Sequence, residues 1–213
     1  MALSLMHISA RRALAGFACT CPGAALVPVL VMMMLSVMLT ASGAALGQKQ
    51  DAGLYVATPQ EVVDVMLDMG SVGAADYVID LGSGDGRIVR SAARRFGASG
   101  VGVEIDPELV TLANNEAKKE GVGTRANFVS ADLWSFDVSR ATVVTVYLLP
   151  SAQARLKQKL LAELKPGTRI VSHDYPFPDW TPVEQKTVID HTKFAVIGEG
   201  KATLYLYVVP ARH

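Results

Sequence analysis

Cysteine is missing from most of this 213-residue chain: Cys19 and Cys21 stand near its beginning, and no other follows. A disulfide scaffold, a cysteine nucleophile and a zinc–thiolate site are therefore excluded from residues 51–213. Acidic residues are in turn missing before position 51, and no residue of either charge occurs from Ala13 to Gln48. The composition thus divides the chain into a nearly uncharged leader and a charged remainder.

The leader has the order of a secretory signal. A basic pair, Arg11-Arg12, precedes an apolar run at 26–39, and small residues fill most of 41–47. The apolar stretch also approaches the ~20 residues that cross a bilayer, so an uncleaved anchor is the alternative. We assign 1–48 to a signal peptide or membrane anchor and 49–213 to one folded domain. Positive charge before the apolar run places that domain outside the cytoplasm, periplasmic or anchored in the inner membrane.

The charged remainder does not look like a nucleic-acid-binding protein. Residues 51–213 carry seventeen basic and twenty acidic side chains, scattered among one another. Nucleic-acid binding calls for a clustered basic face, so no nucleic-acid partner is expected. The sequence gives no indication of an oligomeric state.

Short apolar runs alternate with amphipathic stretches, a pattern typical of a parallel α/β sheet. Strands are expected at Tyr77–Leu81, Gly100–Glu104, Arg125–Ser130, Ala141–Leu148 and Thr168–His173, with helices at Gly86–Phe96, Pro107–Glu120 and Ser151–Leu164. Two late strands, Val188–Ile197 and Ala202–Val209, are expected to form a hairpin across Gly198-Glu199-Gly200. We therefore predict a Rossmann-like, doubly wound, mostly parallel seven-stranded sheet with a C-terminal antiparallel hairpin.

An earlier helix is predicted to begin at Thr58-Pro59-Gln60-Glu61. This places a threonine at the N-cap, a proline in the first helical position and a glutamate that closes a capping box. A helical apolar stripe follows, at Val62, Val63, Met66, Leu67 and Met69.

The segment Asp80-Leu-Gly-Ser-Gly-Asp-Gly86 joins a predicted strand to a predicted helix. Such a loop lies at the carboxyl edge of the sheet, where nucleotide-like ligands bind. Its spacing differs from the dinucleotide fingerprint because position 87 is Arg. Asp80 and Asp85 would repel a pyrophosphate at the helix N-terminus, whereas they suit a ligand with a cation such as an α-amino group.

The ends of the next two predicted strands offer two further acceptors. Glu104 lies where an acidic side chain takes ribose hydroxyls, and Asp132 can accept from an adenine amino group while Leu133 and Trp134 lie against the ring. The alternative for Asp132 is to cap the following turn. Amino-group, ribose and adenine sites on three successive strands together indicate S-adenosylmethionine.

On these motifs the chain resembles the class I, seven-strand S-adenosylmethionine-dependent methyltransferases. It is most similar to the small lysine methyltransferases that modify mitochondrial inner-membrane proteins, ATP synthase among them, and to their bacterial relatives. Tyr55–Pro59 and Phe177–Pro182 also support this resemblance. It implies S-adenosyl-L-methionine as cofactor and a protein lysine as acceptor. Cofactor binding is expected from Tyr55, Thr58, Asp80, Gly82, Ser83, Gly84, Gly86, Glu104, Ile105, Asp132 and Leu133.

The acceptor end of the site is less defined. Tyr147-Leu-Leu-Pro150 stands where many methyltransferases place Asn-Pro-Pro-Tyr, so methylation of nucleic-acid bases loses support. Tyr147 and Asp174 are the candidates for contact with the acceptor, and core packing and loop positioning are their alternatives. A small-molecule acceptor, a non-catalytic adenosyl-binding module and a nicotinamide dehydrogenase are competing functions.

The leader and the cofactor conflict, because S-adenosylmethionine is made in the cytoplasm. Three hypotheses resolve this. An inverted anchor would leave the domain at the cytoplasmic face, the domain could be exported folded with its ligand, or the true start could lie downstream.

Overall fold

The computed structural model describes residues 56–198 and 200–212. Tyr55 and the predicted leader at 1–48 lie outside these residues. Within the described ranges, none of the helices combines the length and the apolar character that a membrane crossing requires.

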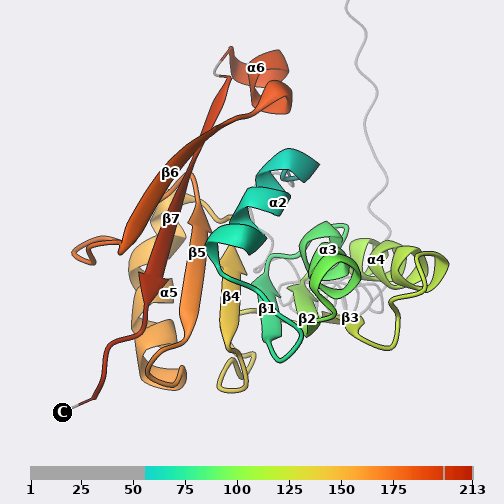
Figure 1. Ribbon diagram of the computed structural model, residues 1–213, viewed down its shortest axis with the longest axis horizontal. Helices are drawn as coiled ribbons and strands as arrows, with labels where there is room; N and C mark the ends of the chain where they lie inside the picture. Colours follow the sequence, from blue (N-terminus) through green and yellow to red (C-terminus); the bar gives the residue numbers. More distant parts are fainter. Residues whose placement is uncertain (1–55, 199, 213) are drawn as a thin grey trace, which may run out of the picture. The chain divides into compact units, whose positions relative to one another are not determined.

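The domain is built on a seven-stranded sheet with the order β3-β2-β1-β4-β5-β7-β6 (Figure 1). Its strands are β1 Tyr77–Leu81, β2 Ser99–Glu104, β3 Ala126–Ser130, β4 Val143–Val146, β5 Arg169–His173, β6 Glu184–Ile189 and β7 Lys201–Val208. The described helices are α2 Gln60–Met69, α3 Arg87–Phe96, α4 Pro107–Lys119, α5 Pro150–Glu163 and α6 His191–Ile197.

Strands β1 to β5 are parallel to one another, and β7 pairs antiparallel with both β5 and β6. This confirms the predicted doubly wound sheet with an antiparallel C-terminal pair. The strand order reverses between β1 and β4, which is the point where ligands bind in open α/β sheets.

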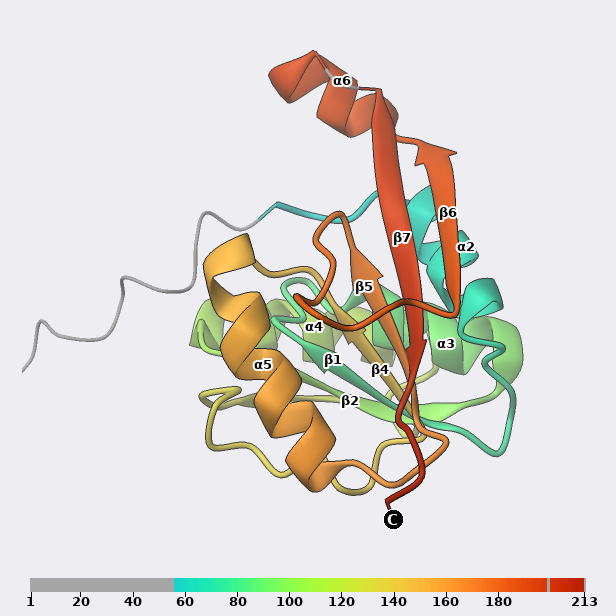
Figure 2. The same cartoon turned by 90° about the vertical axis from the view of Figure 1, so that its left-hand side faces the viewer.

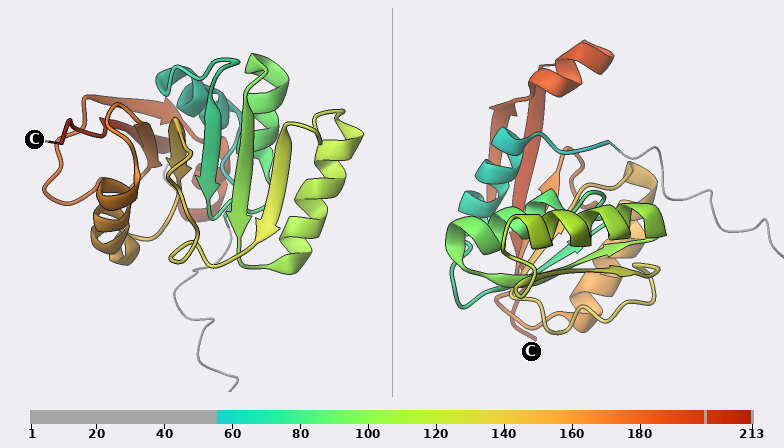
Figure 3. Two further views of the ribbon diagram at one scale, coloured as in Figure 1. Left: turned by 90° about the horizontal axis from the view of Figure 1, so that it is seen from below. Right: turned by 90° about the vertical axis from the view of Figure 1, so that its right-hand side faces the viewer.

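Helices cover both faces of the sheet, with α3 and α4 on one face and α5 on the other (Figure 3). Successive side chains of a strand point to opposite faces of the sheet, so each strand contributes to the core on either face. Val78 and Val143 pack with α2 on one face. Ile79 and Val144 pack with Leu156 and other residues of α5 on the other. All four residues of β4 are buried, as the centre of a two-sided sheet requires.

The predicted first helix has the expected buried stripe, but its cap was predicted wrongly. The N-cap of α2 is Pro59, with no side-chain capping bond, so the capping box between Thr58 and Glu61 does not form. The reason is long-range, because Thr58 is held by residues of α3 and β5. Its carbonyl accepts from Arg87 Nη1 at 2.8 Å, and its Oγ1 lies 3.3 Å from His173 Nδ1.

The predicted strand Val188–Ile197 was wrong over most of its length. Strand β6 ends at Ile189, and the short helix α6 follows, so β6 and β7 are joined by a helix rather than by a tight hairpin turn. Asp190 caps α6 by accepting from the Lys193 amide at 2.7 Å, and Gly198 ends it with φ of 75°. These two signals outweigh the β-branched residues between them. The β6–α6–β7 arm extends beyond the other strands (Figure 2).

Candidate active site

The candidate site lies at the carboxyl ends of β1, β2 and β4, where the strand order reverses. Gly82, Gly84 and Gly86 follow β1 and all have positive φ, at 79°, 52° and 79°. A Cβ at Gly86 would collide with the Phe128 ring and come within 2.8 Å of Ala113 Cβ. Glycine is thus required at position 86, where α3 packs closely on β3 and α4. The predicted contact of Gly86 with the cofactor stays a prediction.

The amides of the glycine loop are already hydrogen-bonded inside the protein. Gly82 N and Ser83 N both donate to Val103 O, at 2.9 and 3.1 Å, and Gly84 N donates to Glu104 Oε2 at 2.9 Å. Gly86 N donates to Ser83 O at 2.9 Å. A pyrophosphate site needs such amides free to donate, so this geometry agrees with the sequence argument against a pyrophosphate.

Asp80 is a buried carboxylate at the end of β1, with 2% of its surface exposed. Burial raises its pKa to about 7; the hydrogen bond from Thr145 Oγ1, at 2.7 Å, opposes this shift, and the charges of Glu104 and Asp85 add to it. Such a carboxylate is stabilised by an incoming cation. The predicted contact with an α-amino group fits this environment.

Ser83 points its hydroxyl back toward the sheet. Its Oγ is buried without a hydrogen-bond partner among the described residues and would lie 2.5 Å from a Cβ built on Gly102. The predicted cofactor contact of Ser83 stays a prediction.

Glu104 is fixed at the end of β2 by three backbone donors. Its Oε2 accepts from Gly84, while its Oε1 accepts from the amides of Ile105 and Asp106, at 2.8 and 3.1 Å. Each carboxylate oxygen can accept about two hydrogen bonds. Oε1 already accepts two and Oε2 accepts one, so Oε2 can still accept a hydrogen bond from a ribose hydroxyl. Ile105 beside it is 48% exposed, as a residue open to a ligand would be.

Asp132 follows β3 and does cap the next turn, since its Oδ1 accepts from the Trp134 amide at 2.9 Å. Its Oδ2 has no hydrogen-bond partner among the described residues, so the capping role and the predicted adenine contact are compatible. Leu133 packs against the core, and the Arg155 guanidinium lies 4.0 Å from the centre of the Trp134 ring.

Tyr147, His173 and Asp174 meet at the ends of β4 and β5, beside the predicted cofactor site. The Tyr147 hydroxyl donates to Asp174 Oδ2 at 3.2 Å, and its ring centre lies 3.9 Å from that of His173. Burial and the Asp174 charge raise the pKa of Tyr147, which keeps it a phenol. Burial lowers the pKa of His173 to about 4, against the opposing charges of Asp174 and Asp190, so the imidazole is neutral at pH 7. The structure therefore brings together the two predicted acceptor-end residues.

Two residues at this edge escaped the sequence analysis. Thr145 has a readable signal, because it is a hydroxyl within the apolar run Val143–Val146, and a buried hydroxyl needs a polar partner. Lys193 had none, because its segment was predicted as a strand, yet its Nζ lies 3.0 Å from Asp174 Oδ2.

The fold, together with the residues at the carboxyl edge of its sheet, is that of the class of S-adenosylmethionine-dependent methyltransferases. Residues 80–184 match the ANTKMT methyltransferase domain. The chain is 44% identical over 156 residues to "Protein-lysine N-methyltransferase" of Saccharolobus islandicus, covering 73% of this chain and 92% of that protein. Similarity also extends to a Xenopus laevis protein named as a lysine N-methyltransferase of ATP synthase, at 36% identity over 71% of this chain and 61% of that one.

A solved structure from Salinibacter ruber, described as an RNA methyltransferase in complex with S-adenosyl-L-homocysteine, is 45% identical. The similarity covers 74% of this chain and 96% of that one, with a TM-score of 0.66. The chain belongs to the methyltransferase family defined by the ANTKMT domain. It is a methyltransferase that uses S-adenosylmethionine.

Proposed function

We propose that this protein transfers the methyl group to the ε-amine of a protein lysine. The observation that carries the proposal is the 44% identity to a protein-lysine N-methyltransferase over 92% of that protein's length. The acceptor end supports it, because the partly buried Tyr147 offers an aromatic ring against which a lysine side chain can pack.

We assign cofactor binding to the carboxylates at the carboxyl ends of the first three strands. Bound S-adenosylmethionine supplies an activated methyl group on a sulfonium sulfur. Asp80 would bind the α-amino cation, Oε2 of Glu104 a ribose hydroxyl, and Oδ2 of Asp132 the adenine amino group. Each is held by a backbone or side-chain donor, so little reorganisation is needed on binding.

The acceptor lysine must lose a proton before its nitrogen can attack, since its free pKa is ~10.4. The low-dielectric surroundings of Tyr147 and His173 favour the neutral amine. Neither residue is a strong base, because the phenol stays protonated and burial depresses the pKa of the imidazole. The chain's task is therefore to position and desolvate the acceptor.

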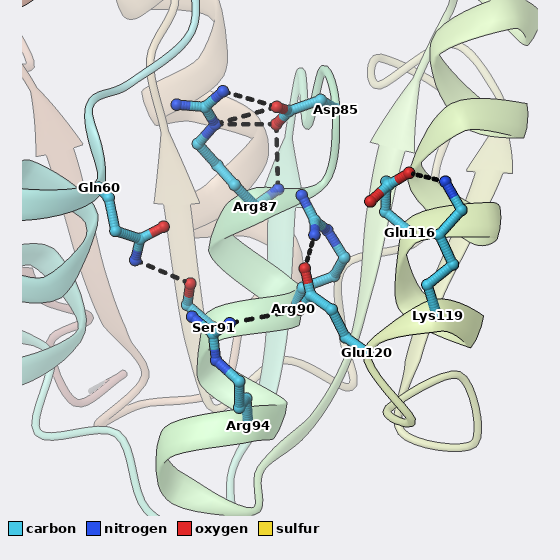
Figure 4. A network of polar contacts seen from close by, with 9 residues as sticks. All are labelled: Gln60, Asp85, Arg87, Arg90, Ser91, Arg94, Glu116, Lys119 and Glu120. Carbon is cyan, nitrogen blue, oxygen red and sulfur yellow. Dashed lines mark hydrogen bonds and ion pairs between the residues drawn. The ribbon is translucent and has the colours of Figure 1, made fainter.

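RNA is the second candidate acceptor, favoured by the description of the Salinibacter structure. Three arginines of α3, Arg87, Arg90 and Arg94, are relevant here because they line a polar cleft of about 280 Å³ (Figure 4). Arg87 pairs with Asp85 at 2.6 Å, and Arg90 and Arg94 both pair with Glu120. Phosphate contacts would require breaking these pairs, which argues against a nucleic-acid surface here.

Labelled methyl transfer from S-adenosylmethionine tests the acceptor. The full chain is incubated with heat-inactivated total protein, total RNA or a small-molecule extract. Methyl-lysine in hydrolysed protein is the expected product. Label in RNA nucleosides or in small molecules alone would overturn the proposal, and Asp80→Asn is the variant expected to lose labelling in every fraction.

For the leader, we propose that 1–48 is a signal peptide or a membrane anchor that places the domain on the periplasmic side of the membrane. The support is its apolar run behind a basic pair. A reporter fused after His213, active only in the periplasm, is expected to be active. Activity of a cytoplasm-only reporter would instead place the domain on the cytoplasmic face.

A further inference from the structure

We propose that Lys193 is a positioning residue, which supplies the counter-charge of Asp174 from the β6–α6–β7 arm and so favours the neutral form of the acceptor amine. This inference rests on the proposed lysine acceptor. It concerns a residue of the antiparallel arm, outside the strands that hold the predicted cofactor site.

Lys193 is fixed at both ends of its side chain. Its Nζ lies 3.0 Å from Asp174 Oδ2 and donates to the carbonyl of Lys201, also at 3.0 Å. Its backbone amide donates to Asp190 Oδ1 at 2.7 Å, the bond that caps α6. With 17% of its side chain exposed, this lysine is a preorganised part of the site, unlike a surface ammonium that an acceptor displaces.

Asp174 is held just as firmly. Its Oδ1 accepts from the Thr203 amide at 3.1 Å, and its own amide donates to the Thr203 carbonyl at 2.7 Å. Its Oδ2 receives both the Tyr147 hydroxyl and Lys193. Asp174 has φ of 62°, an uncommon conformation for a non-glycine residue, which this network maintains. The carboxylate therefore cannot turn away from the acceptor end when its counter-charge is lost.

A lone carboxylate at this place would oppose catalysis. A negative charge near an amine stabilises the ammonium form, and an ammonium has no lone pair with which to attack a methyl group. The Lys193 cation offsets this effect and adds its own repulsion toward a second ammonium. A neighbouring cationic group is a general means of lowering the pKa of a nucleophilic lysine.

The remaining titratable groups around Lys193 do not substitute for it. His173 from β5 is neutral, Tyr147 after β4 is a protonated phenol, and Tyr175 faces Tyr147 with ring centres 6.3 Å apart. Asp190, which caps α6, contributes a second negative charge and is 3% exposed. Loss of Lys193 would thus leave the Asp174 carboxylate without the cation that contacts it.

The test is the pH dependence of methyl-lysine formation, with heat-inactivated total protein as the acceptor probe. In Lys193→Gln the acid limb of the rate profile is expected to move up by about one pH unit, so that the rate at neutral pH falls ~10-fold. Lys193→Arg keeps the charge and should retain the wild-type limb. Lys186→Gln removes an exposed lysine of β6 and serves as the matched control.

A second variant separates charge from folding. Lys193→Gln combined with Asp174→Asn removes both charges and is expected to return the acid limb toward its wild-type position. The affinity for S-adenosylmethionine, measured by calorimetry, should be the same as that of the wild type in each variant of Lys193 and in the double variant. An unmoved acid limb in Lys193→Gln, or a displaced one in the double variant, overturns the inference. Absence of methyl-lysine with the wild-type chain overturns the proposed function instead.

Discussion

Asp80 and Thr145 are register partners on the adjacent parallel strands β1 and β4, and the threonine hydroxyl donates to the carboxylate at 2.7 Å. This pair stands where the strand order reverses. A buried acid is thereby kept in place with a single hydroxyl donor, in surroundings that disfavour its charge.

Asp80→Asn should weaken S-adenosylmethionine binding by ~10–100-fold, the usual range for loss of a hydrogen bond to a charged group. Calorimetric titration of the full chain measures this. Asp68→Asn, on the exposed face of α2, is the control and should bind as the wild type does. Equal affinities for the Asp80 variant and the wild type would remove the role of this carboxylate.

The affinity for S-adenosylmethionine should depend on pH through Asp80, whose pKa is raised to about 7. The cationic amino group binds the ionised form, so affinity is expected to fall as the pH drops below about 7, by up to ~10-fold per pH unit. In Asp80→Asn this dependence should vanish. A pH-independent wild-type affinity between about 5 and 7 would contradict the prediction.

The raised pKa of Asp80 should also affect the stability of the ligand-free protein. Stability should fall as the pH rises, whereas the affinity for the cofactor should rise. Because the folded-state pKa of Asp80 is raised, its contribution is full below the unfolded pKa of ~3.9 and is lost as the pH rises through about 7. The free energy of unfolding of the wild type should therefore decline relative to Asp80→Asn as the pH rises toward 7. Urea titrations at several pH values measure the difference, and parallel curves would refute it.

Gly86→Ala should destabilise the fold more than Gly121→Ala does. Both glycines have positive φ, 79° and 73°, but a Cβ at Gly121 would meet no atom within 4 Å. The Gly121 variant thus reports the backbone cost alone, about 1–2 kcal/mol. Overpacking against Phe128 and Ala113 should add about 1–3 kcal/mol for Gly86. Similar melting temperatures for the two variants would show that the close packing relaxes.

Tyr147→Phe should separate the acceptor end from the cofactor site. The ring keeps its packing on His173, whereas the hydrogen bond to Asp174 is lost. We expect unchanged cofactor affinity and a methyl-transfer rate lowered ~10-fold, the equivalent of about 1.4 kcal/mol. Titration and labelled transfer measure the two quantities, and a wild-type rate would return Tyr147 to a packing role.

Local patterns were enough to predict the parallel half of the sheet. The buried strand Tyr77–Leu81 was predicted with its observed bounds, because a β-branched run is followed directly by a glycine loop. The carboxyl ends of parallel strands meet at one edge, so Asp80, Glu104 and Asp132 could be assigned to one site before their contacts were known.

What sequence reasoning missed depends on partners far along the chain. Thr58 has a capping pattern, yet its hydroxyl lies beside His173, 115 positions away. The segment after Ile189 is rich in β-branched residues, and only the capping residues Asp190 and Gly198 mark it as a helix. With α6 predicted as a strand, Lys193 could not be placed beside Asp174.

The cofactor end and the acceptor end of the site are built from different parts of the chain. The glycine loop and the carboxylates near it lie at the carboxyl ends of β1 to β3, whereas Asp174 is tied to Thr203 and Lys193 of the arm. The edge strand β6 is largely exposed, and its Val188 packs against the core that contains α2. On this division, substitutions in the β6–α6–β7 arm can alter the acceptor end while leaving the strands that carry the glycine loop untouched.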